Sequence, residues 1–161
     1  MLDLIGHTLE EMINIQKQLI NYSEQKKTVL IERKVAELNP IIQEEAKLVK
    51  QLGLVEHERK QQVEMALQEH PSLSFSQFIE TLQDDERSRK LSSQLDTLRK
   101  LSVELQAKNR GNEQLLKDSL NFAQYMIDHL THSKQRHFNY QSPLSPQNTH
   151  TTGHGFFDTK A

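Results

Sequence analysis

The sequence predicts an all-α fold, an elongated antiparallel bundle of about three long helices with coiled-coil-like packing and a disordered C-terminal tail. Two observations predict it. Apolar residues recur at steps of three and four along most of the chain, which is the spacing of one face of an α-helix. Near residue 132 this rhythm stops, and polar residues with Gly and Pro dominate from there on. We therefore expect a helical domain over residues 1–132 and a flexible polar tail over residues 133–161.

The first helix is predicted over residues 2–33, where strong helix formers fill the outer face. Its apolar stripe weakens at Gln16, Ser23 and Lys26, so we do not expect tight pairing along the whole helix. A bend is expected at Glu32-Arg33-Lys34. The stripe consists of Leu2, Ile5, Leu9, Met12, Ile13, Leu19, Ile20 and Leu30.

Asn39-Pro40 is the second candidate for this bend and for the start of the second helix, because Asn caps helices and Pro fits the first turn. Residues 56–62 have no apolar side and should be fully solvated, and His70-Pro71 should end the helix. A capping box from Ser74 to Gln77 then opens a short connector whose apolar residues should tuck into one end of the bundle. The apolar residues of the second helix are Ile41, Ile42, Leu48, Val49, Leu52 and Val55.

The third helix is expected to start near the acidic run at residues 84–86 and to end at about Thr131. Its stripe is wide, which favours contact with two neighbouring helices. Ser102, Asn109 and Asn112 interrupt it; such residues either fix the register or mark a stretch that opens to receive a partner. The heptad positions are Leu91, Leu95, Leu98, Ser102, Leu105, Asn109, Asn112, Leu116, Ser119, Ala123, Met126 and Leu130.

Composition excludes several classes of function. The chain has no Cys, which excludes thiolate chemistry. Its net charge of −2 argues against a nucleic-acid-binding protein, which needs a basic stripe. Eight histidines are present, but no Glu-x-x-His pair that a helical-bundle metal site would use. Nucleophile elbows and Gly-rich phosphate loops are absent as well. We expect no catalytic residues, no cofactor and no metal, and a soluble intracellular protein without signal peptide or membrane insertion.

Two features point to protein partners. The end of the third helix carries a dense apolar patch, which is either a partner surface or simply part of the bundle core. The tail carries isolated aromatics in a polar setting, most notably Tyr140, and such residues can anchor docking motifs. The sequence does not decide between Tyr140 and Phe156-Phe157 as the contact. The patch contains Leu115, Leu116, Leu120, Phe122, Ala123, Met126, Ile127 and Leu130.

With these residues described, the chain resembles the FlgN family of flagellar export chaperones. The resemblance rests on EQKKTVLIERKVAEL (24–38), on the Asn-rich LQAKNRGNEQLLKDSLNFAQYMIDHL (105–130), and on the tail with Tyr140 and FFDTKA (156–161). The chain departs from the family at the first turn, where Arg33-Lys34 stands in place of the Gly-Asp of many members.

The resemblance implies a cytoplasmic chaperone that binds the C-terminal helices of hook–filament junction proteins, prevents premature assembly and delivers them to the flagellar type III export gate. Tyr140 would contact the gate. The alternative is a coiled-coil scaffold that self-assembles without cargo, and the sequence leaves homo-oligomerisation open. The expected cargo-binding residues are Leu115, Leu116, Ser119, Leu120, Phe122, Ala123, Met126, Ile127 and Leu130.

Overall fold

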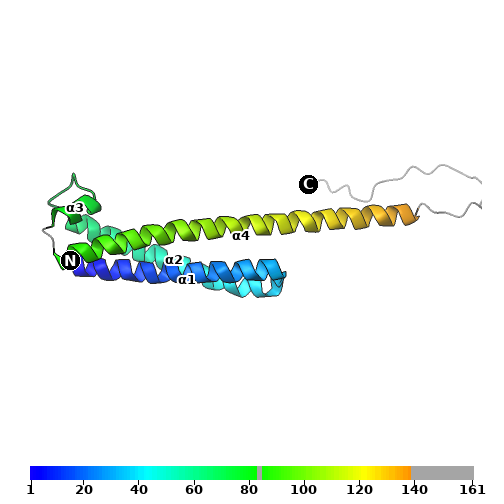
Figure 1. Cartoon of the computed structure of the whole chain (residues 1–161), viewed down its shortest axis with the longest axis horizontal. Coiled ribbons are helices and arrows are strands. Elements are labelled where there is room, and N and C mark those ends of the chain that lie inside the picture. Colours follow the sequence, from blue (N-terminus) through cyan, green and yellow to red (C-terminus); the bar gives the residue numbers. More distant parts are fainter. Residues whose placement is uncertain (83–84, 139–161) are drawn as a thin grey trace, which may run out of the picture. The chain divides into compact units, whose positions relative to one another are not determined.

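A computed structural model describes residues 1–82 and 85–138, with the side chains of residues 135–138 left out. Four helices make up this part of the chain, and it contains no strand (Figure 1). The all-α prediction is therefore confirmed. The helices are α1 (Leu2–Glu32), α2 (Val35–Ala66), α3 (Phe75–Thr81) and α4 (Glu86–Phe138). By compactness the chain divides into unit 1, Met1–Asn121, and unit 2, Phe122–Ala161, so α4 contributes to both.

Helix α1 ends where the sequence predicts a bend. Arg33 adopts a left-handed conformation with φ 58°, and its N–H donates to the carbonyl of Leu30 at 3.3 Å. The N–H of Lys34 donates to the carbonyl of Val29 at 3.0 Å. These two bonds form a Schellman motif, which satisfies carbonyls that the helix end leaves without partners. The chain therefore reverses direction within two residues.

Helix α2 begins at Val35, so the bend lies at the first candidate position, Glu32-Arg33-Lys34, and not at Asn39-Pro40. Pro40 lies inside the helix. Its missing N–H would have bonded the carbonyl of Ala36 in the first turn, so one helical bond is lost close to the end, where the helix tolerates it. Helix α2 runs antiparallel to α1, because Lys26 pairs with Glu45 at 2.8 Å whereas Gln51 bonds Glu11 at 3.1 Å.

The sequence predicts that the polar stretch at residues 56–62 is fully solvated, and this prediction is wrong. Gln62 is only 3% exposed. Thr8 Oγ1 donates to Gln62 Oε1 at 3.0 Å, and Gln62 Nε2 donates to Glu58 at 2.9 Å. The side-chain amide of Gln62 can be buried because its oxygen and its nitrogen both have hydrogen-bond partners. Counting apolar residues cannot predict this burial. Helix α2 then ends at Ala66, before the expected His70-Pro71.

Helix α3 closes one end of unit 1. Ser74 and Gln77 form the predicted capping box, with the Gln77 N–H donating to Ser74 Oγ at 3.3 Å and the Ser74 N–H donating to Gln77 Oε1 at 2.9 Å. Phe75 and Ile79 are buried there, as predicted for this connector. They form one core cluster with Ile5, Leu9 and Leu91.

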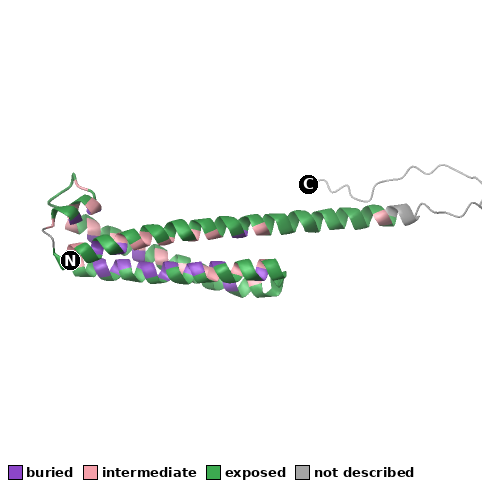
Figure 2. Cartoon of the chain, viewed as in Figure 1, coloured by how far each residue is buried: buried purple, intermediate pink, exposed green. Residues whose placement is uncertain are grey.

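Helix α1 lies at the centre of unit 1 and holds most of its buried residues (Figure 2). A second cluster of Met12, Ile15, Leu19 and Val55 continues the core, with Leu98 and Leu105 of α4 packed against it. Helix α4 runs parallel to α1 within this unit, because Gln94 bonds Gly6 and Asn112 bonds Ser23. Unit 1 is thus built on the up-down-up order of α1, α2 and α4.

The third helix is longer than the sequence predicts, since α4 ends at Phe138 and not near Thr131. The residues that follow Thr131 are compatible with a helix even though they carry no apolar stripe. None of the helices in the described ranges combines the length and the apolar character that a membrane span requires.

Candidate functional site

The predicted cargo-binding residues in unit 1 lie on the last two turns of its α4 segment. Leu116 and Leu120 are 42% and 63% exposed. Leu115 is half-buried and faces a groove beside Ser23, so it belongs partly to the bundle. The hydroxyl of Ser119 donates to the carbonyl of Leu115 at 2.8 Å. Leu116 and Leu120 are therefore the exposed large apolar residues among the predicted ones in this unit.

The predicted residues of unit 2 share one face of its helix. At 100° per residue they fall within an arc of about 140°, which is a wide apolar face. All of them are exposed, with values of 51% for Phe122, 40% for Met126, 57% for Ile127 and 54% for Leu130, and Ala123 is exposed too. The structure therefore supports a surface in place of a bundle core for these five residues.

Tyr125 is a candidate that the sequence analysis missed. It is 64% exposed, and its ring stacks on that of His129 with centroids 6.2 Å apart. This pair widens the apolar face of unit 2 on one side. The sequence feature that could have identified Tyr125 is an aromatic residue in a helix, next to Met126 and four residues before His129.

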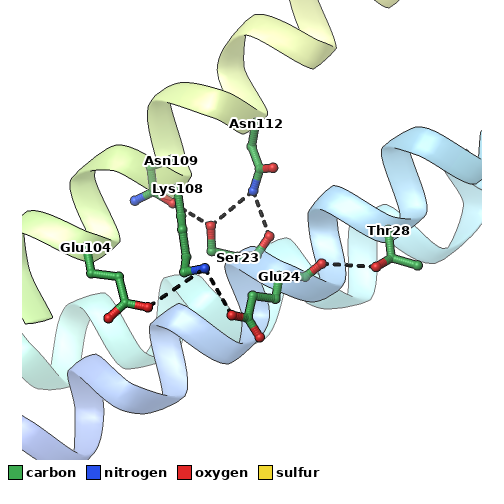
Figure 3. Close-up of polar contacts among 7 residues, drawn as sticks. All are labelled: Ser23, Glu24, Thr28, Glu104, Lys108, Asn109 and Asn112. Atoms are coloured by element: carbon green, nitrogen blue, oxygen red, sulfur yellow. Dashed lines mark hydrogen bonds and ion pairs between the residues drawn. The ribbon is translucent and has the colours of Figure 1, made fainter.

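Three polar residues that interrupt the apolar stripe of α4, Ser102, Asn109 and Asn112, form hydrogen bonds with α1. Their partners, Gln16 and Ser23, are two of the residues at which the apolar stripe of α1 weakens. Gln16 Nε2 donates to Ser102 Oγ at 3.0 Å. Further along, Ser23 Oγ donates to Asn109 Oδ1 at 3.2 Å, and Asn112 Nδ2 donates to the Ser23 carbonyl at 2.7 Å (Figure 3). We call these contacts the polar seam. Their spacing fixes the register of α4 against α1.

Charges flank the polar seam without entering it. Lys108 Nζ lies 3.0 Å from Glu24 and 3.8 Å from Glu104 (Figure 3). The hydrogen bond to Glu24 raises the pKa of the Lys108 ammonium above its ordinary value. The ion pair is exposed and adds mainly to the specificity of the register.

Unit 1 also carries grooves on both sides of the polar seam. One, of about 470 Å³, is bordered by Lys27, Ala107, Gly111 and Leu115. The other, of about 510 Å³, lies between α2 and α4 over Leu19 and includes Ile42 and Val49. The sequence signal for this second groove was the doubling of apolar residues at Ile41-Ile42 and Leu48-Val49, which makes two neighbouring faces of α2 apolar.

No group of three or more metal-binding side chains comes together within the residues that the structure describes. His129 contacts an aromatic ring, not a carboxylate cluster. Tyr140, Phe156 and Phe157, the predicted docking residues, lie outside the described residues.

Comparison with protein families finds one match. The model of the FlgN protein family matches residues 1–147, which is most of the chain. Comparisons with curated proteins and with solved structures gave no match.

Proposed function

This chain belongs to the FlgN family of flagellar export chaperones, and from that premise we propose that it binds hook–filament junction proteins in the cytoplasm and delivers them to the type III export gate. The observation that carries the proposal is the exposed apolar face of unit 2. An uncharged face formed by Phe122, Met126 and Leu130 is far more apolar than a solvated helix requires.

A helix-on-helix contact fits this face. A cargo helix with an apolar stripe of its own can pack on the face of unit 2. Met126 adapts its shape to different partners because its side chain is unbranched. Leu116 and Leu120 of unit 1 are the further cargo contacts in this proposal.

Binding alone suffices to prevent premature assembly. A chaperone that prefers the unassembled subunit lowers the free concentration of that subunit by mass action, without nucleotide or chemistry. We place delivery on the tail, where Tyr140 contacts the export gate while the helices hold cargo.

The central test is cargo binding by an altered surface. Leu120→Asp with Met126→Asp introduces one charge among the proposed contacts of unit 1 and one into the apolar face of unit 2, and we expect binding of a junction-protein C-terminal peptide to weaken by about 100-fold or more. Size-exclusion chromatography and fluorescence anisotropy with a labelled peptide measure this. A matched control is Leu54→Asp with Val103→Asp, because both residues are exposed apolar residues outside the proposed surface.

A folded double variant that binds the peptide like the unaltered chain would move the cargo site elsewhere. If no junction-protein peptide ever co-elutes with the unaltered chain, the self-assembling scaffold becomes the better account. Separately, Tyr140→Ala should retain peptide binding and reduce export of the cargo in cells. Normal export and motility with this variant would contradict a role of Tyr140 at the gate.

A further inference from the structure

A small pocket lies between the beginnings of α1 and α4, at the end of unit 1 where both helices start (Figure 1). Its volume is about 160 Å³. Gly6 and Leu91 line it and are buried, whereas Arg87 and Lys90 line it and are exposed. None of these residues takes part in the proposed cargo contacts. We call this site the α1–α4 pocket.

A buried acceptor in this pocket lacks a hydrogen-bond donor. Gln94 lines the pocket and is 9% exposed, and its Nε2 donates to the carbonyl of Gly6 at 3.1 Å. Its Oε1 is buried and accepts no hydrogen bond from any residue that the structure describes. Leaving a buried carbonyl oxygen without a donor is unfavourable, so the pocket favours a ligand that brings an N–H or O–H group.

Gly6 leaves the space beside this oxygen open. A Cβ at residue 6 would lie 3.6 Å from Gln94 Oε1 and 3.6 Å from Leu91 Cδ2. A methyl group there would therefore occupy the space next to the acceptor. The bond to Gly6 holds the amide of Gln94 in place, and its terminal torsion is broad enough for small rotations that turn Oε1 toward a donor in the pocket.

The rim of the pocket carries more positive than negative charge. Arg87 and Lys90 come from α4, and Asp3 comes from α1, with its Oδ1 at 3.7 Å from Arg87 Nε. His7 adds an imidazole that can donate a hydrogen bond. Both helices also begin at this end, where their dipoles attract negative charge. Because Asp3 repels a dianion more strongly than a monoanion, the rim favours a ligand with one negative charge.

These features define the ligand. It carries one negative charge for Arg87 and Lys90, and an N–H donor close to that charge for Gln94 Oε1. It is also small, since pockets for whole ligands have about 300–1,000 Å³. The C-terminal residue of a polypeptide has all three properties, because its carboxylate and its backbone N–H are attached to the same Cα. Capture of a chain terminus is a recurring mode of peptide recognition.

We propose that the α1–α4 pocket binds the free C-terminal residue of a polypeptide. The carboxylate pairs with Lys90 and Arg87, and the backbone N–H of the same residue donates to Gln94 Oε1. In one respect this rests on the proposed function, since we assign the polypeptide to the C-terminal segment of the cargo. The pocket then distinguishes a segment that ends the cargo chain from the same sequence inside a longer chain, which has no carboxylate at that position.

NMR titration of the full chain with three short probes tests the pocket directly. N-acetyl-alanyl-alanine should shift the side-chain amide signals of Gln94. It should bind about 10-fold more tightly than its C-terminal amide, which cannot form the charge-assisted hydrogen bonds. An analogue with an ester in place of the last peptide bond lacks the N–H and should bind about 5-fold more weakly than the acid.

Four variants locate the binding. Lys90→Ala should lose most of the preference for the acid over the amide, and Gln94→Leu should bind the acid and the ester alike. Gly6→Ala should weaken binding of the acid about 10-fold without unfolding, because its methyl group fills the pocket at ordinary contact distances. The control Lys100→Ala removes a charge from an exposed residue of α4 outside the pocket and should bind like the unaltered chain.

An acid that binds no better than the amide would overturn the proposal, as would full affinity for the acid in both Lys90→Ala and Gly6→Ala. A junction-protein peptide with a free or an amidated C-terminus tests the assignment to cargo. Amidation should weaken its binding about 10-fold, and equal binding of both forms would exclude cargo as the occupant. If the peptide binds in neither form, the proposed function fails, while the short probes still decide whether the pocket takes a chain terminus.

Discussion

The hydrogen bonds between Asn112 and Ser23 give unit 1 a stability contribution that can be measured. Asn112 is 6% exposed, and its Nδ2 donates to the Ser23 carbonyl at 2.7 Å and to Ser23 Oγ at 3.0 Å. Asn112→Ala removes both bonds, each of which contributes about 0.5–1.5 kcal/mol net. Ala gains about 0.5 kcal/mol of helix propensity over Asn. We therefore expect the free energy of unfolding to fall by about 1–2 kcal/mol.

Urea denaturation followed by circular dichroism at the helix band measures this difference. Asn14→Ala is the matched control, because Asn14 is exposed on α1 and its replacement gives only the gain in propensity. The difference between the two variants isolates the buried bonds.

A second variant separates hydrogen bonding from packing. Ser23→Ala with Asn112→Leu replaces both partners by apolar groups, which should be close to neutral or stabilising, since Asn109, which loses the bond from the Ser23 hydroxyl, is exposed to water. If Asn112→Ala unfolds at the same urea concentration as Asn14→Ala, the polar seam does not hold α4 in solution.

Three further predictions concern unit 1. Leu9 is fully buried, so Leu9→Ala should cost about 2–5 kcal/mol in thermal or urea unfolding, whereas Leu120→Ala, at 63% exposure, should change it by less than about 0.5 kcal/mol. Gly6→Ala should stabilise by about 0.5–1 kcal/mol, because a Cβ there meets Gln94 and Leu91 at an ordinary 3.6 Å; a lower melting temperature would show that the close approach of α4 needs the glycine. The hydrogen bond from Arg59 lowers the pKa of Glu56 below its ordinary 4.5, so the stability that the pair adds is present above that pH and lost as the pH falls through the lowered pKa. Glu56→Gln should thus cost about 0.3–0.5 kcal/mol at pH 7 and progressively less in acid, and a cost that does not change with pH would contradict this assignment.

The sequence predicts the helices of this protein well because each carries its own apolar stripe and end signals. The bend at Arg33-Lys34 and the capping box at Ser74 follow from local residues, and both are found. The alternative start of α2 at Asn39-Pro40 rested on the preference of Pro for the first turn, whereas the turn before Val35 is set by the end of α1.

Polar contacts between segments that are distant in sequence were the main feature of the fold that the sequence did not predict. Gln16 and Ser23 appeared as weak points of a stripe, yet they bond residues 86 to 89 positions further along the chain. Thr8 and Gln62 form a buried pair for the same reason. Hydrophobic periodicity cannot reveal such pairs, because the partner of a buried polar residue is known only once the register is known.

The apolar end of α4 was identified from the sequence as either core or surface, and exposure in unit 2 favours surface. The groove between α2 and α4 was not predicted because Ile42 and Val49 were counted with Ile41 and Leu48 in one stripe. Adjacent apolar residues repeated every seven positions point in two directions from a helix, so one neighbour cannot cover both.

The two-residue turn at Arg33 has a consequence for the order of folding. Contacts between α1 and α2 are local in sequence, whereas those between α1 and α4 close a loop of more than 80 residues. Loop closure is slower and entropically costlier when the loop is long, so the α1–α2 hairpin should form in the folding nucleus and α4 should dock later. During synthesis, the ribosome releases this hairpin before α4 exists. The face of α1 that later binds Asn112 is then bare, and that interval is when the nascent chain is most prone to aggregate.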